Sequence, residues 1–285
     1  MKKMKNILKH RLQLLSAFTV ALALFVSCDL DETQTVATLN NLVMADEFDV
    51  DGAPDANLWN YEIGDGSAQG IPGWGNNELQ YYTDRSENVT VQNGVLIITA
   101  NEESFMGSQY TSARITTQAK FEQAYGRFEA RIKLPTGKGI WPAFWLLGND
   151  CDVNPWPACG EIDIMEYLGD QPTTVFGTVH GPGYSGANGI TKEYNLTNDR
   201  FDNGFHIFGI EWGPDFINYY VDGDLYQSIT PATVAEETNG AGEWVYNRPF
   251  YIILNIAVGG NLPGSPNADT VFPQRMLVDY VRVYN

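Results

Sequence analysis

Three carboxylates lie within six residues of one another in this sequence of 285 residues. Glu161, Asp163 and Glu166 belong to the run GEIDIME at residues 160–166, in which the other side chains are apolar or absent. An unpaired buried charge is costly, so acids in an apolar run indicate function. In a regular strand Glu166 would face away from the other two acids, because side chains alternate between faces. We predict a β-bulge between Asp163 and Glu166 that returns Glu166 to their face.

Two carboxyl groups on one face, about 5 to 5.5 Å apart, suit cleavage of a glycosidic bond with retention of configuration. Glu161 would attack the anomeric carbon, and Glu166 would protonate the departing oxygen and later act as the base. Asp163 would hydrogen-bond the nucleophile and, by its charge, raise the pKa of the acid. The alternative for the motif alone is an edge strand with three solvated acids. The apolar residues between the acids and the aromatic segment before them favour catalysis.

The elements that position these acids are predicted to be β-strands. From Met44 onward, short β-rich segments alternate with Gly, Pro, Asn and Asp, and no stretch has the spacing of a long amphipathic helix. Asn93-Gly94 predicts a tight hairpin, and residues 127–134 alternate between charged and apolar. Further strands are expected at residues 206–212, 216–221, 251–258 and 276–284. The fold class is therefore predicted to be all-β, a jelly-roll sandwich of two antiparallel sheets.

The N-terminal region has the pattern of an export signal. Basic residues precede an apolar run from Leu15 to Val26 that is too short to span a bilayer. The run ends in Phe-Val-Ser-Cys, which resembles a bacterial lipobox and predicts lipidation of Cys28; a plain secretory signal is the alternative. The predicted divisions are a signal peptide at 1–27, a flexible acidic tether at 28–43 and a catalytic domain at 44–285.

Charge and cysteine content restrict the partners and the compartment. With 17 Lys and Arg against 35 Asp and Glu, the net charge is -18, which disfavours nucleic acid and anionic polysaccharides. A neutral polysaccharide is the expected partner, and a monomer is expected. The acidic residues after Cys28 resemble signals that send some Gram-negative lipoproteins to the cell surface. We therefore expect an outer-membrane lipoprotein that faces outward, with a periplasmic or secreted location as the alternatives.

The acid motif and several other segments resemble glycoside hydrolase family sixteen, in its laminarinase-like branch. The matching segments, in order, are residues 74–83 (WGNNELQYYT), 110–114 (YTSAR), 141–145 (WPAFW), 178–181 (TVHG), 211–212 (EW), 254–260 (LNIAVGG) and 278–284 (VDYVRVY). The resemblance implies a jelly roll with a concave substrate cleft and endo-hydrolysis of β-1,3-glucan through a covalent glycosyl-enzyme intermediate. Lichenases of the family, specific for mixed-linkage glucan, have a shorter, unbulged acid motif, so the extra residue favours the laminarinase branch.

The same resemblance implies a set of substrate-binding residues. Trp141 and Trp145 match cleft positions, although tryptophans of a sandwich are more often core. Asn76 and Arg114 match positions that hydrogen-bond sugar hydroxyls, and Arg114 could instead pair with a surface acid. His180 would bond the substrate or orient an acid, against the alternative of a satisfied sheet residue. Trp156 could lie in the core or in the cleft, and His206 is expected to be structural.

The remaining expectations concern metal and cysteine. Three His without repeated Cys/His spacing give no catalytic zinc site, so no catalytic cofactor is expected. The family often carries a structural calcium held by backbone oxygens, and the matching positions are Glu47, Gly94 and Asp279. Cys151 and Cys159 bracket a short loop in an exported chain, which makes a disulfide plausible; two free buried thiols are the alternative.

Other functions remain open at this point. A non-catalytic carbohydrate-binding lipoprotein would need the aromatic residues but not the paired acids, and a purely structural lipoprotein would need neither. Within the enzyme interpretation, the alternatives are hydrolysis of mixed-linkage β-glucan or of an agarose-type galactan. Transglycosylation shares the same covalent intermediate and is a further alternative.

Overall fold

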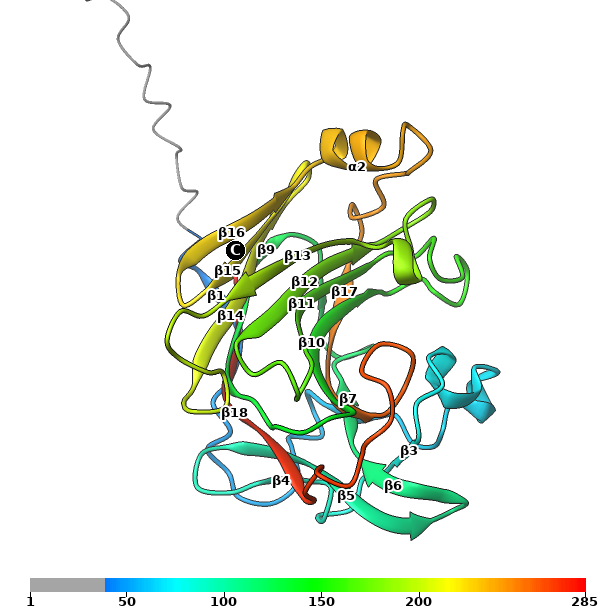
Figure 1. Cartoon of the computed structure of the whole chain (residues 1–285). Helices are drawn as coiled ribbons and strands as arrows, with labels where there is room; N and C mark the ends of the chain where they lie inside the picture. The colour runs from blue at the N-terminus through cyan, green and yellow to red at the C-terminus, as the bar shows by residue number, and fades with distance from the viewer. Residues whose placement is uncertain (1–38) are drawn as a thin grey trace, which may run out of the picture. The chain divides into compact units, whose positions relative to one another are not determined.

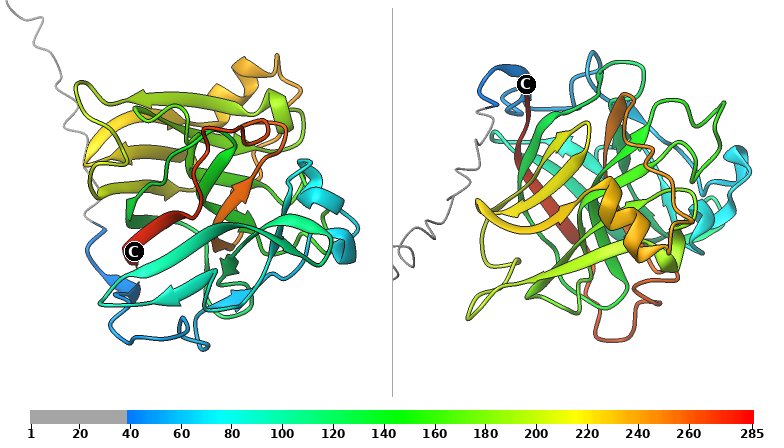
Figure 2. Two further views of the ribbon diagram at one scale, coloured as in Figure 1. Left: turned by 60° about the horizontal axis from the view of Figure 1, so that its bottom comes forward. Right: turned by 90° about the horizontal axis from the view of Figure 1, so that it is seen from above.

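Two β-sheets make up most of residues 39–285, the part of the chain that the computed structural model describes. These residues form one unit, Leu39–Asn285. The predicted signal peptide, Cys28 and most of the predicted tether lie outside the described residues. The sheets lie face to face, and a single apolar core fills the space between them (Figures 1 and 2). Trp212 of one sheet, for example, contacts Phe250 of the other, with ring centroids 5.2 Å apart.

The larger sheet has ten strands. Its order is β16 (Asp224–Ile229), β15 (Phe216–Val221), β14 (His206–Gly213), β9 (Gly126–Lys133), β18 (Gln274–Tyr284), β5 (Leu96–Phe105), β6 (Ser108–Ser112) and β3 (Gln80–Tyr82), with β1 (Leu42–Asp46) beside β18 and β4 (Val89–Val91) beside β5. Every pair is antiparallel except β3 and β6, which run parallel.

The smaller sheet has eight strands and carries the acid motif. Its order is β13 (Ile190–Asn195), β12 (Thr174–His180), β11 (Glu161–Tyr167), β10 (Ile140–Gly148), β17 (Phe250–Val258), β7 (Arg114–Thr116) and β2 (Asn60–Tyr61), with β8 (Glu122–Gln123) also paired to β17. All its pairs are antiparallel. The prediction of an all-β sandwich of two sheets is therefore confirmed.

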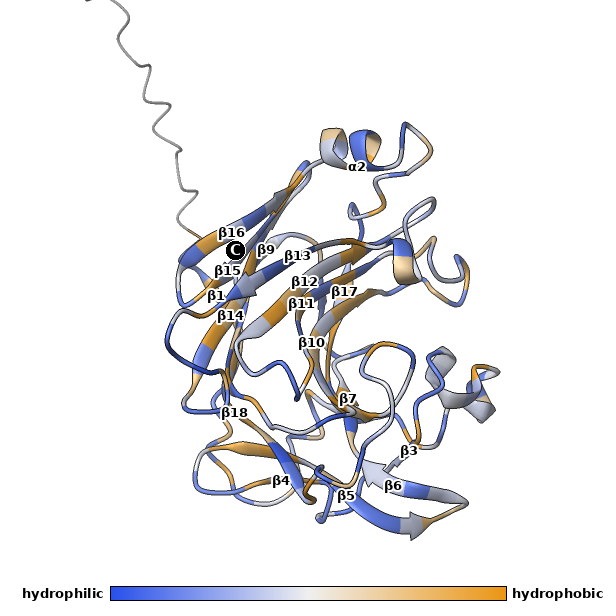
Figure 3. Ribbon diagram, in the orientation of Figure 1, coloured by the Kyte–Doolittle hydropathy of each residue, from blue (hydrophilic) through white to orange (hydrophobic). Residues whose placement is uncertain are grey.

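Local sequence accounts for the strand boundaries. Asn93 and Gly94 both have positive φ, 54° and 75°, in the turn between β4 and β5, as the hairpin prediction requires. On β9, Phe128, Ala130 and Ile132 are fully buried, as their alternation predicts. Hydrophobic residues lie mainly on the strands (Figure 3).

Two features differ from the sequence expectations. The sheet begins before Met44, because β1 starts at Leu42 and pairs with the end of β18, so part of the predicted tether belongs to the folded unit. A short helix, α2 (Pro231–Glu237), also follows β16. Its start is encoded locally, since Thr230 and Thr233 form a reciprocal capping box and Pro231 occupies the first turn. Within residues 39–285, no helix combines the length and apolar character needed to cross a membrane.

Within residues 39–285, the three other helical segments are single 3-10 turns, at Ser67–Gln69, Pro72–Gly75 and Gly186–Asn188. The last of them lies in the connection between β12, which ends at His180, and β13.

Candidate active site

The predicted bulge is present in β11. Asp163 pairs with Thr178 of β12 and Glu166 with Phe176, so two residues of β11 oppose Gly177 alone. The register against β10 shifts at the same place. Gly177 has no room for a side chain, because a Cβ there would lie 2.3 Å from the Tyr226 hydroxyl oxygen. The bulge brings Glu166 to the face of Asp163, since Thr178, the partner of Asp163, donates to the Glu166 carboxylate.

Glu161 lies at the start of β11 and is partly exposed. The indole Nε1 of Trp156 donates to its Oε2 at 2.6 Å. Trp156 is 45 % exposed, which resolves the open question of its location: it lies over the acid and not in the core. Sequence spacing alone gave no means of choosing between these two locations.

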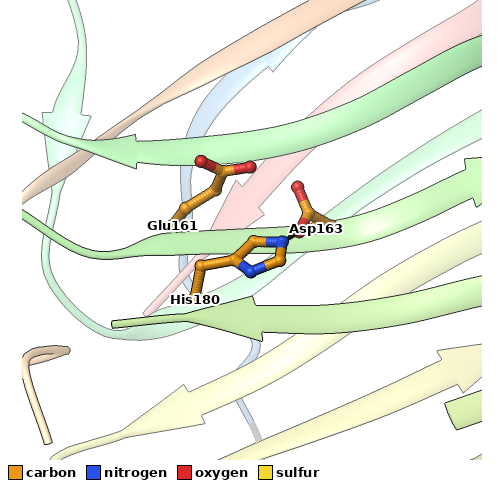
Figure 4. Close-up of side chains that lie close together, drawn as sticks. All are labelled: Glu161, Asp163 and His180. Carbon is orange, nitrogen blue, oxygen red and sulfur yellow. Dashed lines mark ion pairs between the residues drawn. The ribbon is translucent and has the colours of Figure 1, made fainter. Parts of the chain in front are cut away.

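Asp163 is buried and contacts His180, whose Nε2 lies 3.2 Å from Asp163 Oδ2. Figure 4 shows Glu161, Asp163 and His180 projecting from the two neighbouring strands toward one another. Asp163 was expected to hydrogen-bond the nucleophile; in the structure its contact is the imidazole instead. The physical reason is that two ionised carboxylates repel, whereas an imidazolium can donate to Asp163.

The charges of this cluster shift its pKa values. Burial lowers the pKa of His180, but the hydrogen bond and charge of Asp163, with the charges of Glu161 and Glu166, outweigh it and raise that pKa to about 9. Burial, followed by the charges of Glu161 and Glu166, raises the pKa of Asp163, and His180 opposes this rise. The Asp163–His180 pair therefore retains a proton near neutral pH.

Glu166 accepts two hydrogen bonds, from Trp141 Nε1 at 3.1 Å and from the Thr178 hydroxyl at 3.3 Å. Burial raises the pKa of Glu166 most strongly; the positive charge of His180 lowers it, and the charge of Glu161 raises it. A carboxyl group with a raised pKa retains its proton to higher pH, as a general acid requires. The raised pKa thus makes Glu166 the carboxyl group of this strand that is suited to donate a proton.

Glu161, Asp163 and His180 are also the one group within residues 39–285 whose ligand atoms lie close enough to hold a metal ion, all within 4.8 Å. The same atoms already have partners that suit proton chemistry, because His180 faces Asp163 and Trp156 donates to Glu161. We assign the cluster to acid and base chemistry.

Arg114 lies on the β17 and β7 side of the carboxylates, between two indoles. Its guanidinium carbon is 4.6 Å from the ring centroid of Trp74 and 4.7 Å from that of Trp145. Arg114 also forms an ion pair with Glu62. From the sequence, Arg114 could contact sugar or a surface acid. In the structure Arg114 is buried and pairs with an acid that is itself largely covered. Trp74 and Glu62 were not among the predicted site residues.

A further acid, Glu78, lies in the centre of a polar network that was not predicted from the sequence. It accepts hydrogen bonds from Gln80 at 2.7 Å, Tyr82 at 3.2 Å and Asn76 at 3.3 Å. Burial raises its pKa, against the opposing effect of Arg114 and these donors. Asn76, predicted to bind sugar, has its amide directed to Glu78. The sequence signal that could have identified this network is an acidic residue, Glu78, among the amide and aromatic residues of the 74–83 segment.

The same network reaches Trp145. The Trp145 Nε1 donates to Asn255 Oδ1 at 2.8 Å, and Asn255 donates to the Tyr82 hydroxyl at 3.2 Å. Trp141 and Trp145 are both partly exposed, so both remain available at the site. His206 was expected to be structural. Its Nδ1 lies 2.7 Å from Asp222 Oδ2, and this pair is not part of the carboxylate cluster.

The predicted calcium positions meet around β18. β1 pairs with β18 up to Asp46, immediately before Glu47, and β5 pairs with β18 up to Val278, immediately before Asp279. Gly94 lies in the turn that leads into β5. The carboxylates of Glu47 and Asp279 are bound by Arg282 and Arg131, so a cation here would have to use backbone oxygens.

Cys151 and Cys159 are joined by a disulfide, with their Cα atoms 5.0 Å apart. The bond encloses the segment that carries Trp156 and lies directly before Glu161. This disulfide therefore belongs to the surroundings of the site.

Residues 76–282 match the family model described as glycosyl hydrolases family 16. The chain belongs to this family. A beta-glucanase from Rhodothermus marinus is 43% identical over 247 residues, which are 85% of this chain and 84% of that protein. Among solved structures, the catalytic domain of an endo-1,3-beta-glucanase (laminarinase) from Thermotoga petrophila RKU-1 has a TM-score of 0.81 at 54% identity, covering 86% of this chain and 97% of that one.

An endo-beta-1,3-glucanase from Pyrococcus furiosus gives the same TM-score, 0.81, at 50% identity over 86% of this chain and 94% of that one. These similarities extend across the carboxylate strand and both sheets. This chain is therefore a glycoside hydrolase with the jelly-roll fold of the family.

Proposed function

We propose that this glycoside hydrolase cleaves internal bonds of β-1,3-glucan with retention of configuration. One observation carries the proposal: the bulge in β11 presents Glu161, Asp163 and Glu166 on one face of the smaller sheet. Without it, Glu166 would face the other way and could not protonate a bond that Glu161 attacks.

The reaction follows from the contacts of each group. Glu161 attacks the anomeric carbon while Glu166 gives its proton to the departing oxygen, and the glycosidic bond breaks. Glu166, now ionised, removes a proton from water, and that water attacks the anomeric carbon of the covalent intermediate. The bond to Glu161 breaks, and both carboxyl groups return to their starting states. Asp163 and His180 hold their shared proton and balance the negative charge during this cycle.

The substrate assignment rests on similarity and on charge. Two of the similar structures are described as enzymes acting on β-1,3-glucan, at 54% and 50% identity. The net charge of -18 favours a neutral polymer. The binding roles proposed for Trp141, Trp145, Arg114 and Asn76 follow from the polar and aromatic network beside the carboxylates. Mixed-linkage glucan and agarose-type galactan are the alternative substrates.

The deciding experiment is incubation of the protein with laminarin, mixed-linkage glucan and agarose, scoring new reducing ends and product sizes. We expect laminarin to be cleaved fastest, into a ladder of oligosaccharides. Proton NMR at early times should show the β-anomer first, because two displacements retain configuration. An α-anomer would contradict the double displacement, and binding without cleavage would favour a carbohydrate-binding protein.

We also propose a structural calcium ion between the end of β1, the middle of β18 and the hairpin turn before β5. Backbone oxygens of Glu47, Gly94 and Asp279 would hold it, because the two carboxylates are occupied by arginines. A chelator should then lower the melting temperature, and added Ca²⁺ should restore it. An unchanged melting temperature would contradict the site.

The location is a proposal from the sequence. Lipidation at Cys28 would anchor the chain to the outer membrane, with the catalytic domain facing outward as a monomer. Metabolic labelling with a fatty acid, compared between the wild type and Cys28→Ala, tests the anchor. Protease treatment of intact cells tests which side the domain faces.

A further inference from the structure

The segment between β10 and β11 is held at both ends. The disulfide between Cys151 and Cys159 closes it. At its base, the amide of Gly148 donates to the carbonyl of Gly160 at 3.1 Å. Next to Cys151, Asp150 forms an ion pair with Arg248. These contacts fix the path of the chain immediately before Glu161.

Trp156 is the large aromatic residue of this segment, and it is exposed to an extent that packing does not explain. It is 45 % exposed, whereas Trp59 and Trp212 are 1 % exposed in the core. Its single N–H donates to Glu161 Oε2 at 2.6 Å, and its ring centroid lies 6.0 Å from that of His180. One edge of the indole therefore holds the proposed nucleophile, while part of the ring faces solvent.

We propose that Trp156 positions the Glu161 carboxylate and offers its exposed ring to a sugar of the substrate, with the disulfide holding it in place. This inference rests on the proposed function. A charge-assisted hydrogen bond to Oε2 fixes the carboxylate and directs Oε1 toward the substrate. Indole faces bury large apolar area and suit the apolar face of a sugar ring.

The place of Trp156 supports a separate sugar contact. The Arg114 cluster, with Trp74 and Trp145, lies toward β17 and β7. Trp156 lies next to His180, toward β12 on the opposite side of β11. A chain bound across the carboxylates would therefore meet aromatic rings on both sides of the cleaved bond.

The disulfide has a defined part in this arrangement. A short segment without a covalent closure would sample many conformations, and ordering it would reduce the affinity and the rate. If the disulfide acts through Trp156, removing the disulfide should change kcat and KM only while Trp156 is present. That dependence distinguishes positioning of the tryptophan from general stabilisation of the fold.

The test compares four variants and one control variant with the wild type on laminarin. Trp156→Phe keeps a ring but loses the N–H, and Trp156→Ala loses both. Cys151→Ser/Cys159→Ser releases the segment, and the triple variant combines this change with Trp156→Ala. Trp244→Phe is the matched control, because it also loses one indole hydrogen bond, to the Pro214 carbonyl at 3.0 Å, away from the carboxylates. Melting temperatures establish that each variant is folded.

We expect Trp156→Phe to lower kcat about tenfold with little change in KM, from loss of one hydrogen bond to a charged group. Trp156→Ala should lower kcat similarly and raise KM about fivefold, from loss of the stacking face. The cysteine variant should lower kcat and raise KM in the wild-type background but have no effect in Trp156→Ala. Trp244→Phe should match the wild type.

An unchanged kcat in a folded Trp156→Phe would overturn the positioning role, and an unchanged KM in Trp156→Ala would overturn the sugar contact. Equal effects of the cysteine changes with and without Trp156 would overturn the role of the disulfide. A wild type that cleaves none of the three polysaccharides would instead refute the proposed function, which separates the two failures.

Discussion

Replacing His180 with Asn should change how the stability of this protein depends on pH. Among the residues that the structure describes, His180 is the one cationic group paired with the buried Asp163, and its side chain is 12% exposed. Its pKa is raised from 6.5 to about 9 in the folded state. A folded-state pKa above the unfolded value means that protonation stabilises the fold. This contribution is fully present below pH 6.5 and is lost as the pH rises through about 9.

The magnitude follows from the size of the pKa shift. The interval between 6.5 and about 9 corresponds to at most about 3 kcal/mol of unfolding free energy. In the variant, Asp163 can take up a proton in place of the imidazole, which reduces the loss. We therefore expect His180→Asn to be less stable than the wild type by about 1 to 3 kcal/mol at pH 6, with a smaller difference at pH 10.

Urea unfolding of both proteins at several pH values measures this difference. The alkaline limb of kcat/KM should also move to higher pH in His180→Asn, because the imidazolium lowers the pKa of Glu166. His206→Asn is the control: it removes an ion pair with Asp222 outside the site and should leave the activity profile in place. A stability difference that is equal at pH 6 and pH 10 would refute the reasoning, since it would mean that His180 is neutral throughout.

Three further outcomes are expected. Glu161→Gln should abolish turnover and leave the binding of laminarin, measured by calorimetry, largely intact. Activity comparable to that of the wild type would show that another group is the nucleophile. Arg114→Lys should weaken substrate binding about tenfold, because a lysine cannot stack between two indoles, and an unchanged KM would contradict this role. Gly189→Ala should lower kcat at nearly constant melting temperature, because the added Cβ would lie 2.4 Å from His180 Cε1; full activity would show that the imidazole position is not critical.

The sequence by itself determined the fold class and the three acids. The alternation over residues 127–134 and the Asn93-Gly94 turn depend on neighbouring residues only, and both appear as expected. The bulge was also predictable, because strand parity would otherwise separate Glu166 from Asp163. In each case the physical cause is local: backbone geometry and side-chain alternation within a few residues.

Only the tertiary structure decided which groups meet. Glu78 is far from Arg114 in sequence, and the importance of its network depends on burial that no local pattern encodes. Asp163 was expected to contact the nucleophile, but the register sets His180 opposite Glu161, and the imidazole lies against Asp163 instead. Trp156 could have been core or cleft, and the path of the disulfide-closed segment places it over Glu161. The sequence specifies which side chains are present, but their contacts and pKa values depend on neighbours that the sheet register brings from distant strands.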